Sequence, residues 1–176
     1  VNPNRLRAID MLPGVQQRLV SVGRLDVASR GLLILTNDGD LVNRLTHPRY
    51  GVSKTYRLRI DGYLKVSDIE RLKKGVWLSK DRPSRKDANL AGAAKVKLIH
   101  RDRERTTLEV VLREGRNRQV RRMMARLGYK VRDLVRIKFG PLSLKSLPAG
   151  AYRKLTFKEL AKLRLTDSQE NKSSMD

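Results

Sequence analysis

Alternating apolar and polar positions predict extended β-strands in four segments of this sequence. Successive side chains on a strand point to opposite faces, so a period of two residues marks a strand with one buried face. The four segments are 54–60, 95–100, 106–113 and 133–139. In the first, Tyr56, Leu58 and Ile60 share one face. The second and third flank a charged turn and predict a β-hairpin.

The last of these strands carries charged residues at regular positions. Strict alternation over 133–139 places Leu134, Arg136 and Lys138 on one face. The other face then takes Val135, Ile137 and Phe139. On this pattern alone, Arg136 is most simply a surface arginine, because arginine side chains are usually exposed.

Four further segments have the features of helices, namely 40–47, 68–74, 117–127 and 156–165. The third has apolar residues at positions i, i+3, i+4 and i+7, with Asn117 as the expected N-cap. Capping boxes that begin at Ser67 and Thr156 predict the starts of the second and fourth. Acidic residues open the first helix and Pro48 follows it.

Shorter apolar runs predict additional strands over 19–22, 32–35, 76–78 and 152–155. The run at 32–35 leads into an Asn-Asp-Gly turn, so we expect it to form a short buried strand. Ser79 to Ala91 is polar and rich in helix breakers, which predicts a loop, and 166–176 is expected to be a disordered tail. The order of elements predicts an α+β fold with a mixed, mostly antiparallel sheet, in one domain over 1–165.

Composition adds a strong excess of positive charge. The 176 residues include 40 Lys and Arg against 18 Asp and Glu, which gives a formal net charge of +22 at pH 7. An acidic polymer is the expected partner of such a chain. The basic residues are spread over several elements and are not gathered on one terminal amphipathic helix, which disfavours a membrane surface as the partner.

Several kinds of site are disfavoured by what the sequence lacks. It has no Cys, so disulfides and thiol chemistry are excluded and a reducing compartment is compatible. His47 and His100 are far apart and lack ligand spacing, which disfavours a zinc site or a histidine-based triad. No apolar run approaches membrane length. Our default expectation is a monomer that needs no protein partner, and both the cytosol and an organelle matrix are compatible with the sequence.

One acidic residue, Asp26, lies between Arg24 and Arg30 just before the apolar run at 32–35. A loop that leads into a core strand gives a reactive group a rigid support. The simpler interpretation is that Asp26 caps a turn or forms an ion pair with Arg24, since such pairs are common in basic chains.

Longer motifs around Asp26 and downstream favour a reactive role for Asp26 over an ordinary cap or ion pair. Gly23-Arg24-Leu25-Asp26, followed by Gly31-Leu32-Leu33 and by Thr36-Asn37-Asp38-Gly39, resembles the active-site signature of the RNA pseudouridine synthases. Within them it is most similar to the RsuA-like branch, which modifies ribosomal RNA. Two further motifs, Lys54-Thr55-Tyr56 and Leu134-Val135-Arg136-Ile137-Lys138-Phe139-Gly140, extend the resemblance. A third match, from Glu114 to Met123, is similar to the RNA-contacting segment of this branch.

The resemblance implies a pseudouridine synthase catalytic fold over about residues 10–155 and a role for each matched residue. Asp26 would be the catalytic carboxylate, Tyr56 would pack on the target base, and Arg136 would pair with Asp26. Members of this branch usually carry a small RNA-binding S4 domain and an Asn-Lys-Pro-x-Gly strand first. Neither is present in this sequence, so we expect full substrate selectivity, and one sheet edge, to depend on a missing segment.

The implied reaction explains these residue types. It breaks the N-glycosidic bond of a uridine, turns the uracil and joins C5 to C1′, with no redox cofactor and no metal. Asp26 would attack C1′ or remove the 2′ proton, and the sequence does not choose between these roles. A nearby guanidinium, from Arg136, would keep the carboxylate ionised in a pocket that excludes water. Tyr56 is otherwise an ordinary core tyrosine on an alternating strand.

Contacts to structured RNA are expected from a larger basic set. The target base must be flipped out of the RNA, at a cost of a few kcal/mol, and Arg24 would hold the nucleotide or fill its gap. The predicted helix over 117–127 has an arginine face without interspersed acids, so phosphate contact is favoured over a merely solvated face. The expected RNA-binding residues are Arg24, Lys54, Arg116, Asn117, Arg118, Gln119, Arg121, Arg122 and Lys138.

Two other classes of function compete with the enzyme. A non-enzymatic RNA-binding or ribosome-assembly protein fits the charge equally well, but such a binder would gain from Arg or Lys in place of Asp26. A metal-dependent nuclease is disfavoured because the sequence contains no evident cluster of carboxylates.

Overall fold

The computed structural model describes residues 7–78 and 90–165 of the chain. Its main element is a six-stranded sheet whose hydrogen-bonded order is β10, β9, β4, β8 and β7, with β2 attached to β9. These strands are Leu142–Ser143 (β10), Val131–Phe139 (β9), Lys54–Asp61 (β4), Arg105–Leu112 (β8), Lys95–Arg101 (β7) and Arg30–Gly31 (β2). Among the described strands of this sheet only β2 and β9 pair in parallel, so the prediction of a mixed, mostly antiparallel sheet is confirmed.

Two small antiparallel ribbons accompany the main sheet. The strands of the first are Val20–Ser21 (β1) and Leu35–Thr36 (β3), and those of the second are Val76–Trp77 (β5) and Leu90–Ala91 (β6). The apolar run at 32–35 is therefore not the single strand that we expected. Instead it crosses from β2 to β3: the Leu32 N–H donates to the Arg136 carbonyl at 2.9 Å, and Ile34 accepts from the Val22 N–H at 2.8 Å.

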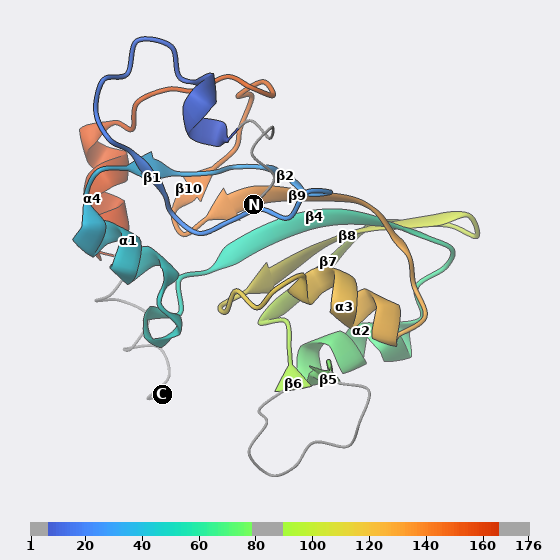
Figure 1. Cartoon of the computed structure of the whole chain (residues 1–176). Helices are drawn as coiled ribbons and strands as arrows, with labels where there is room; N and C mark the ends of the chain where they lie inside the picture. Colours follow the sequence, from blue (N-terminus) through green and yellow to red (C-terminus); the bar gives the residue numbers. More distant parts are fainter. Residues whose placement is uncertain (1–6, 79–89, 166–176) are drawn as a thin grey trace.

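Four α-helices and two short 3₁₀ helices occur in the described part of the chain. They are Ala8–Met11 (η1), Gly39–Thr46 (α1), Pro48–Tyr50 (η2), Val66–Lys74 (α2), Gln119–Arg126 (α3) and Phe157–Leu165 (α4). Figure 1 shows α2 and α3 on the same side of the main sheet, whereas α1 and α4 lie together near β1 and β10. None of the helices within 7–78 and 90–165 is long and apolar enough to cross a membrane.

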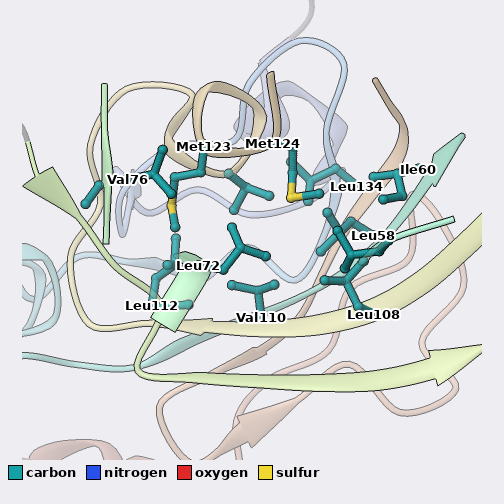
Figure 2. Close-up of a cluster of buried hydrophobic side chains, with 14 of the residues drawn as sticks. Leu58, Ile60, Leu72, Val76, Leu108, Val110, Leu112, Met123, Met124 and Leu134 are labelled. Carbon is teal, nitrogen blue, oxygen red and sulfur yellow. The ribbon is translucent and has the colours of Figure 1, made fainter. Parts of the chain in front are cut away.

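The apolar side chains gather in two clusters that match these two groups of helices. The larger cluster joins the inner faces of β4, β8 and β9 to α2 and α3, with Leu58, Leu72, Val110 and Met123 among its members (Figure 2). The second joins α1 and α4 to the far end of β9 through Leu45, Leu163 and Phe139. Each buried leucine or phenylalanine contributes about 1.5–3 kcal/mol relative to an exposed one. The candidate site lies where the two clusters meet, along β4 and β9.

Most of the predicted elements are confirmed, with boundaries that differ by one or two residues. The alternating segments form β4, the β7–β8 hairpin and β9, and the four predicted helices form α1 to α4. At the start of α4, the Thr156 N–H donates to Glu159 Oε2 at 2.9 Å and the Glu159 N–H donates to Thr156 Oγ1 at 3.2 Å. This reciprocal pair is the capping box expected from the sequence.

Several predicted boundaries were wrong. The N-cap of α2 is Lys65 and not Ser67, since the Lys65 carbonyl already accepts from the Asp68 N–H at 3.1 Å and from the Ile69 N–H at 3.2 Å. The N-cap of α3 is Arg118 and not Asn117. No strand forms over 152–155, whereas Leu90 and Ala91, at the end of the expected loop, belong to β6. The rest of that loop (79–89) and the expected tail (166–176) lie outside the described residues. The interpretation as one domain stays a prediction.

A bulge in the β4–β9 pairing changes the faces predicted for β9. Thr55 pairs with Lys138 and Tyr56 with Arg136, so Ile137 has no partner of its own on β4. The extra residue reverses the alternation beyond it. Lys138 is exposed and Phe139 is buried, with the Arg136 guanidinium carbon 5.2 Å from the Phe139 ring centroid. The expectation that Lys138 shares the face of Leu134 and Arg136 was therefore wrong.

The parallel pairing of β2 with β9 joins residues that are more than 100 positions apart in the sequence. Arg30 pairs with Val135 and Gly31 with Arg136, and the Arg30 side chain reaches Asp133 at 2.7 Å. Gly31 has φ of +112°, and a Cβ there would lie 2.4 Å from the Arg136 carbonyl oxygen. Any larger residue would push β2 away from β9.

The first prediction follows from this close approach. Gly31→Ala should lower the free energy of unfolding by about 3 kcal/mol, because the methyl group meets backbone that cannot yield and the φ is unfavourable for alanine. Gly39→Ala is the matched control, since a Cβ added at Gly39, in α1, would meet no atom within 4 Å. Urea denaturation of both variants measures the difference. Equal stability of the two variants would contradict this account of the β2–β9 pair.

Candidate active site

A cavity of about 550 Å³ opens between the loop that precedes β2, strands β4 and β9, and the loop that precedes α3. Its size lies in the range usual for ligand sites. It is lined by the three predicted catalytic residues and by most of the predicted RNA-binding residues: Asp26, Tyr56, Arg136, Arg24, Lys54, Arg116, Asn117, Arg118 and Gln119. Arg121, Arg122 and Lys138 do not line it. The structure thus brings together motifs that are far apart in the sequence.

Asp26 lies in a turn whose backbone is fixed. The Ser29 N–H donates to the Asp26 carbonyl at 2.8 Å, and β2 follows directly. Within 7–78 and 90–165, the Asp26 carboxylate makes no hydrogen bond and no ion pair within 4.0 Å, so it neither caps a turn nor pairs with Arg24 there. The side chain is partly exposed and faces the cavity.

Arg136 is almost completely buried, at 2% exposure, on the β9 side of the same cavity. Its Nε donates to the Leu32 carbonyl at 2.7 Å and its Nη1 donates to the Arg24 carbonyl at 3.2 Å. Its Nη2 is buried without a hydrogen-bond partner among the described residues. A buried unpaired donor is costly, and a charged one especially so. The guanidinium is therefore held by the Asp26 loop and still has one nitrogen available for an acceptor.

Lys54 adds a second buried cation to the cavity wall. It is 8% exposed, its Nζ donates to the Val52 carbonyl at 3.0 Å, and Nζ lies 5.1 Å from the Phe139 ring centroid. Burial, together with the positive charge of Arg136, lowers the pKa of Lys54 from 10.5 to about 8. The charge of this wall thus depends on pH just above neutrality.

Tyr56 stands beside Arg136 because the two residues are partners in the β4–β9 register. Its side chain is partly buried, packs against the larger apolar cluster and lines the cavity. The sequence left open whether Tyr56 belongs to the core or to the site. In the structure its ring does both, since it contacts the apolar cluster and borders the cavity.

The loop before α3 is braced by an acid that the sequence reasoning did not select. Glu114 accepts from Arg116 Nε at 2.8 Å and from Gln119 Nε2 at 2.6 Å, and Gln119 Oε1 in turn accepts from the Arg116 N–H at 3.1 Å. Arg118 has a φ of 46°, an unusual conformation for arginine. The signal that could have found Glu114 is its position as the single acid at the start of a run of cations.

The predicted RNA-binding residues outside the cavity have other surroundings. Arg121 and Arg122, on α3, donate to backbone carbonyls: Arg121 Nη1 to Val131 at 3.0 Å and Arg122 Nη2 to Leu78 at 3.2 Å. Lys138 is exposed beyond the bulge of β9. In the described part of the chain, no three His, Cys, Asp or Glu side chains are grouped so that they could hold a metal ion.

Comparison with known proteins identifies relatives of this chain. Over 154 residues the chain is 36% identical to an uncharacterized RNA pseudouridine synthase of Aquifex aeolicus, covering 88% of this chain and 59% of that protein. It is also 36% identical over 165 residues to the ribosomal large subunit pseudouridine synthase B of Bacillus subtilis, covering 92% and 64% of the two chains. The chain therefore spans about three fifths of the length of these relatives.

A solved structure and a family comparison also match pseudouridylate synthases. The crystal structure of a pseudouridylate synthase matches with a TM-score of 0.69 and 35% identity, over 82% of this chain and 59% of that one. The match confirms the predicted fold. The RNA pseudouridylate synthase family matches residues 4–126, which is more than half of the sequence. The resemblance inferred from the motifs is confirmed, and the chain belongs to the RNA pseudouridylate synthase family.

Proposed function

We propose that this chain is the catalytic part of a ribosomal RNA pseudouridine synthase, an isomerase that converts a uridine within RNA to pseudouridine. The observation that carries the proposal is that Asp26, on a fixed turn, lines one cavity with Tyr56 and Arg136 from the neighbouring strands β4 and β9. The curated relatives named for ribosomal large subunit modification support ribosomal RNA as the substrate class.

The reaction is balanced within the substrate. The C1′–N1 bond breaks and a C1′–C5 bond forms. C5 loses its proton, and N1 gains one. Asp26 serves either by attack on C1′ or by removal of the 2′ proton, and both roles require the ionised carboxylate. Tyr56, whose ring borders the cavity, supports the detached uracil by stacking.

Arg136 is the cation that stands ready to pair with the Asp26 carboxylate. Its hydrogen bonds to the Leu32 and Arg24 carbonyls hold the guanidinium against the Asp26 loop, and its unpaired Nη2 can receive the carboxylate when substrate closes the site. Substrate binding would exclude water and strengthen this interaction.

The remaining cavity residues bind RNA. The cavity wall carries the positive charges of Arg24, Lys54, Arg116 and Arg118, which suits a nucleotide held by its phosphates. Of its two acids, Glu114 is bound to Arg116 and Gln119, and Asp26 faces the cavity. Extrusion of the base costs a few kcal/mol, and contacts of this kind offset that cost. Arg122 and Lys138 lie outside the cavity and would contact the RNA beyond the flipped nucleotide. We place the reaction in the cytosol or an organelle matrix, with the chain acting as a monomer.

A non-enzymatic RNA-binding protein is the less favoured alternative. It accounts for the net charge of +22 but gives no reason for the Asp26 carboxylate, which makes no hydrogen bond to any described residue, to face a basic cavity. A pure binder would avoid such a charge because it repels phosphate.

The second prediction tests Asp26 directly. Asp26→Asn should reduce pseudouridine formation in a ribosomal RNA transcript to background, because an amide can neither attack C1′ nor accept the 2′ proton. RNA affinity should stay within about twofold of wild type, since the change removes no positive charge. Asp40→Asn, at the exposed start of α1, is the matched control and should retain full activity. Mass spectrometry of the digested RNA measures the product, and activity in Asp26→Asn would refute the proposal.

The third prediction uses the pKa of Lys54. Because its pKa is about 8, the ammonium is present below pH 8 and is lost as pH rises through that value. RNA affinity should therefore fall between about pH 7 and pH 9, and Lys54→Met should bind more weakly at pH 7 with a flatter profile. Filter binding at constant ionic strength measures both, and the exposed Lys95→Met on β7 serves as the control. Parallel profiles for wild type and Lys54→Met would exclude a phosphate contact by Lys54.

A further inference from the structure

We propose that Arg121 is a positioning residue that holds the Asp26 turn in place, and that its main role is not a contact to RNA phosphate. The inference rests on the proposed function and adds one residue to its machinery. It departs from the expectation of phosphate binding that the arginine face of α3 raised.

The contacts of Arg121 join three separate elements. The residue belongs to α3, its Nη1 donates to the Val131 carbonyl at the start of β9 at 3.0 Å, and its Nη2 donates to the Ala28 carbonyl at 2.5 Å. Its Nε is buried without a partner among the described residues. Both terminal nitrogens, which would form a fork around a phosphate, are thus directed at backbone oxygens of this chain.

The Ala28 carbonyl belongs to the turn that presents Asp26. That turn is closed by the hydrogen bond from the Ser29 N–H to the Asp26 carbonyl, at 2.8 Å. On the other side of Asp26, Arg136 Nη1 holds the Arg24 carbonyl at 3.2 Å. Asp26 therefore stands between two backbone carbonyls, each held by a guanidinium from a different element. Such a clamp fixes the direction of the carboxylate without touching it.

Another arginine of α3 shows that this arrangement is specific to position 121. Arg126 Nη2 donates to the Leu78 carbonyl at 3.2 Å, just after β5 and away from the Asp26 turn. Loss of Arg126 would remove a charge and a helix-to-backbone bond of the same kind. It would leave the Asp26 turn intact, which makes it the matched control.

The experiment compares Arg121→Ala, Arg121→Lys and Arg126→Ala with wild type and with Asp26→Asn. Single-turnover rates on saturating RNA should fall about 100-fold in Arg121→Ala, the effect expected when a reacting group is misplaced by about 1 Å. The dissociation constant for RNA should change by no more than about twofold. Arg121→Lys should restore little of the rate, because one ammonium cannot reach both carbonyls. Arg126→Ala should keep the wild-type rate.

Amide hydrogen exchange gives a second readout that needs no activity. In Arg121→Ala and in Arg121→Lys, exchange should become faster at Ser29 and Leu32, whose N–H groups close the turn and pair with β9. The amides of β4 and β8 should stay as protected as in wild type, which separates a loosened turn from an unfolded protein.

Three results would overturn the clamp. One is unchanged exchange at Ser29 in Arg121→Ala. Another is weaker RNA binding with an unchanged rate on bound RNA, which would make Arg121 a phosphate ligand. The third is full recovery in Arg121→Lys. If wild-type protein makes no pseudouridine while exchange changes as expected, the proposed function fails and the clamp stands.

Discussion

The pairing of two residues, Gly31 with Arg136, is the contact on which the arrangement of the site depends. A two-residue parallel strand has little stability of its own, since strands are stabilised by longer ladders and packing. Here the backbone of Leu32 donates to the Arg136 carbonyl, and the Arg136 side chain returns a bond to the Leu32 carbonyl. Backbone and side chain of one residue thus hold the same short strand. The absent Cβ of Gly31 is what allows the approach.

Burial of positive charge follows from that contact. Arg136 and Lys54 are both nearly inaccessible, and they face the same cavity from adjacent strands. Burial of Lys54, and the like charge of Arg136 beside it, disfavour the ammonium and lower the pKa of Lys54. An anion in the cavity removes part of that cost. The cavity wall therefore holds an unfavourable interaction that a bound anion, or the Asp26 carboxylate if it moved inward, would relieve.

The sequence predicted those parts of the fold that depend on local pattern. Strand β4 alternates over its whole length, and the capping box of α4 lies within four residues, so both could be inferred from neighbours in the chain. The bulge at Ile137 could not, because it arises from the register between β4 and β9 and leaves no mark in the alternation. For the same reason the run at 32–35 looked like one strand, although Leu32 bonds to Arg136 on β9 and Ile34 bonds to Val22 after β1.

The candidate site shows a similar division. The residues of the sequence motifs do line one cavity in the structure. Glu114 was missed because an acid beside cations suggests only an ordinary ion pair. Its second bond, to the buried amide of Gln119, exists only in the folded loop.

The arginines of this chain also show why net charge alone overstates the number of side chains free to contact an acidic polymer. A guanidinium offers five donors in a fixed fork, so it can join backbone carbonyls that no other side chain would connect. Arg121 and Arg136 each join two backbone carbonyls in this way, and both hold the loop that carries Asp26. Arg126 donates to the Leu78 carbonyl just after β5. Their charges count toward the excess that attracts an acidic polymer, while their nitrogens are directed into the protein. An irregular active-site loop needs such donors because it lacks a ladder to satisfy its carbonyls. High arginine content thus serves two purposes in this fold, a positive charge that attracts acidic polymers at long range and rigidity of the loop that carries Asp26.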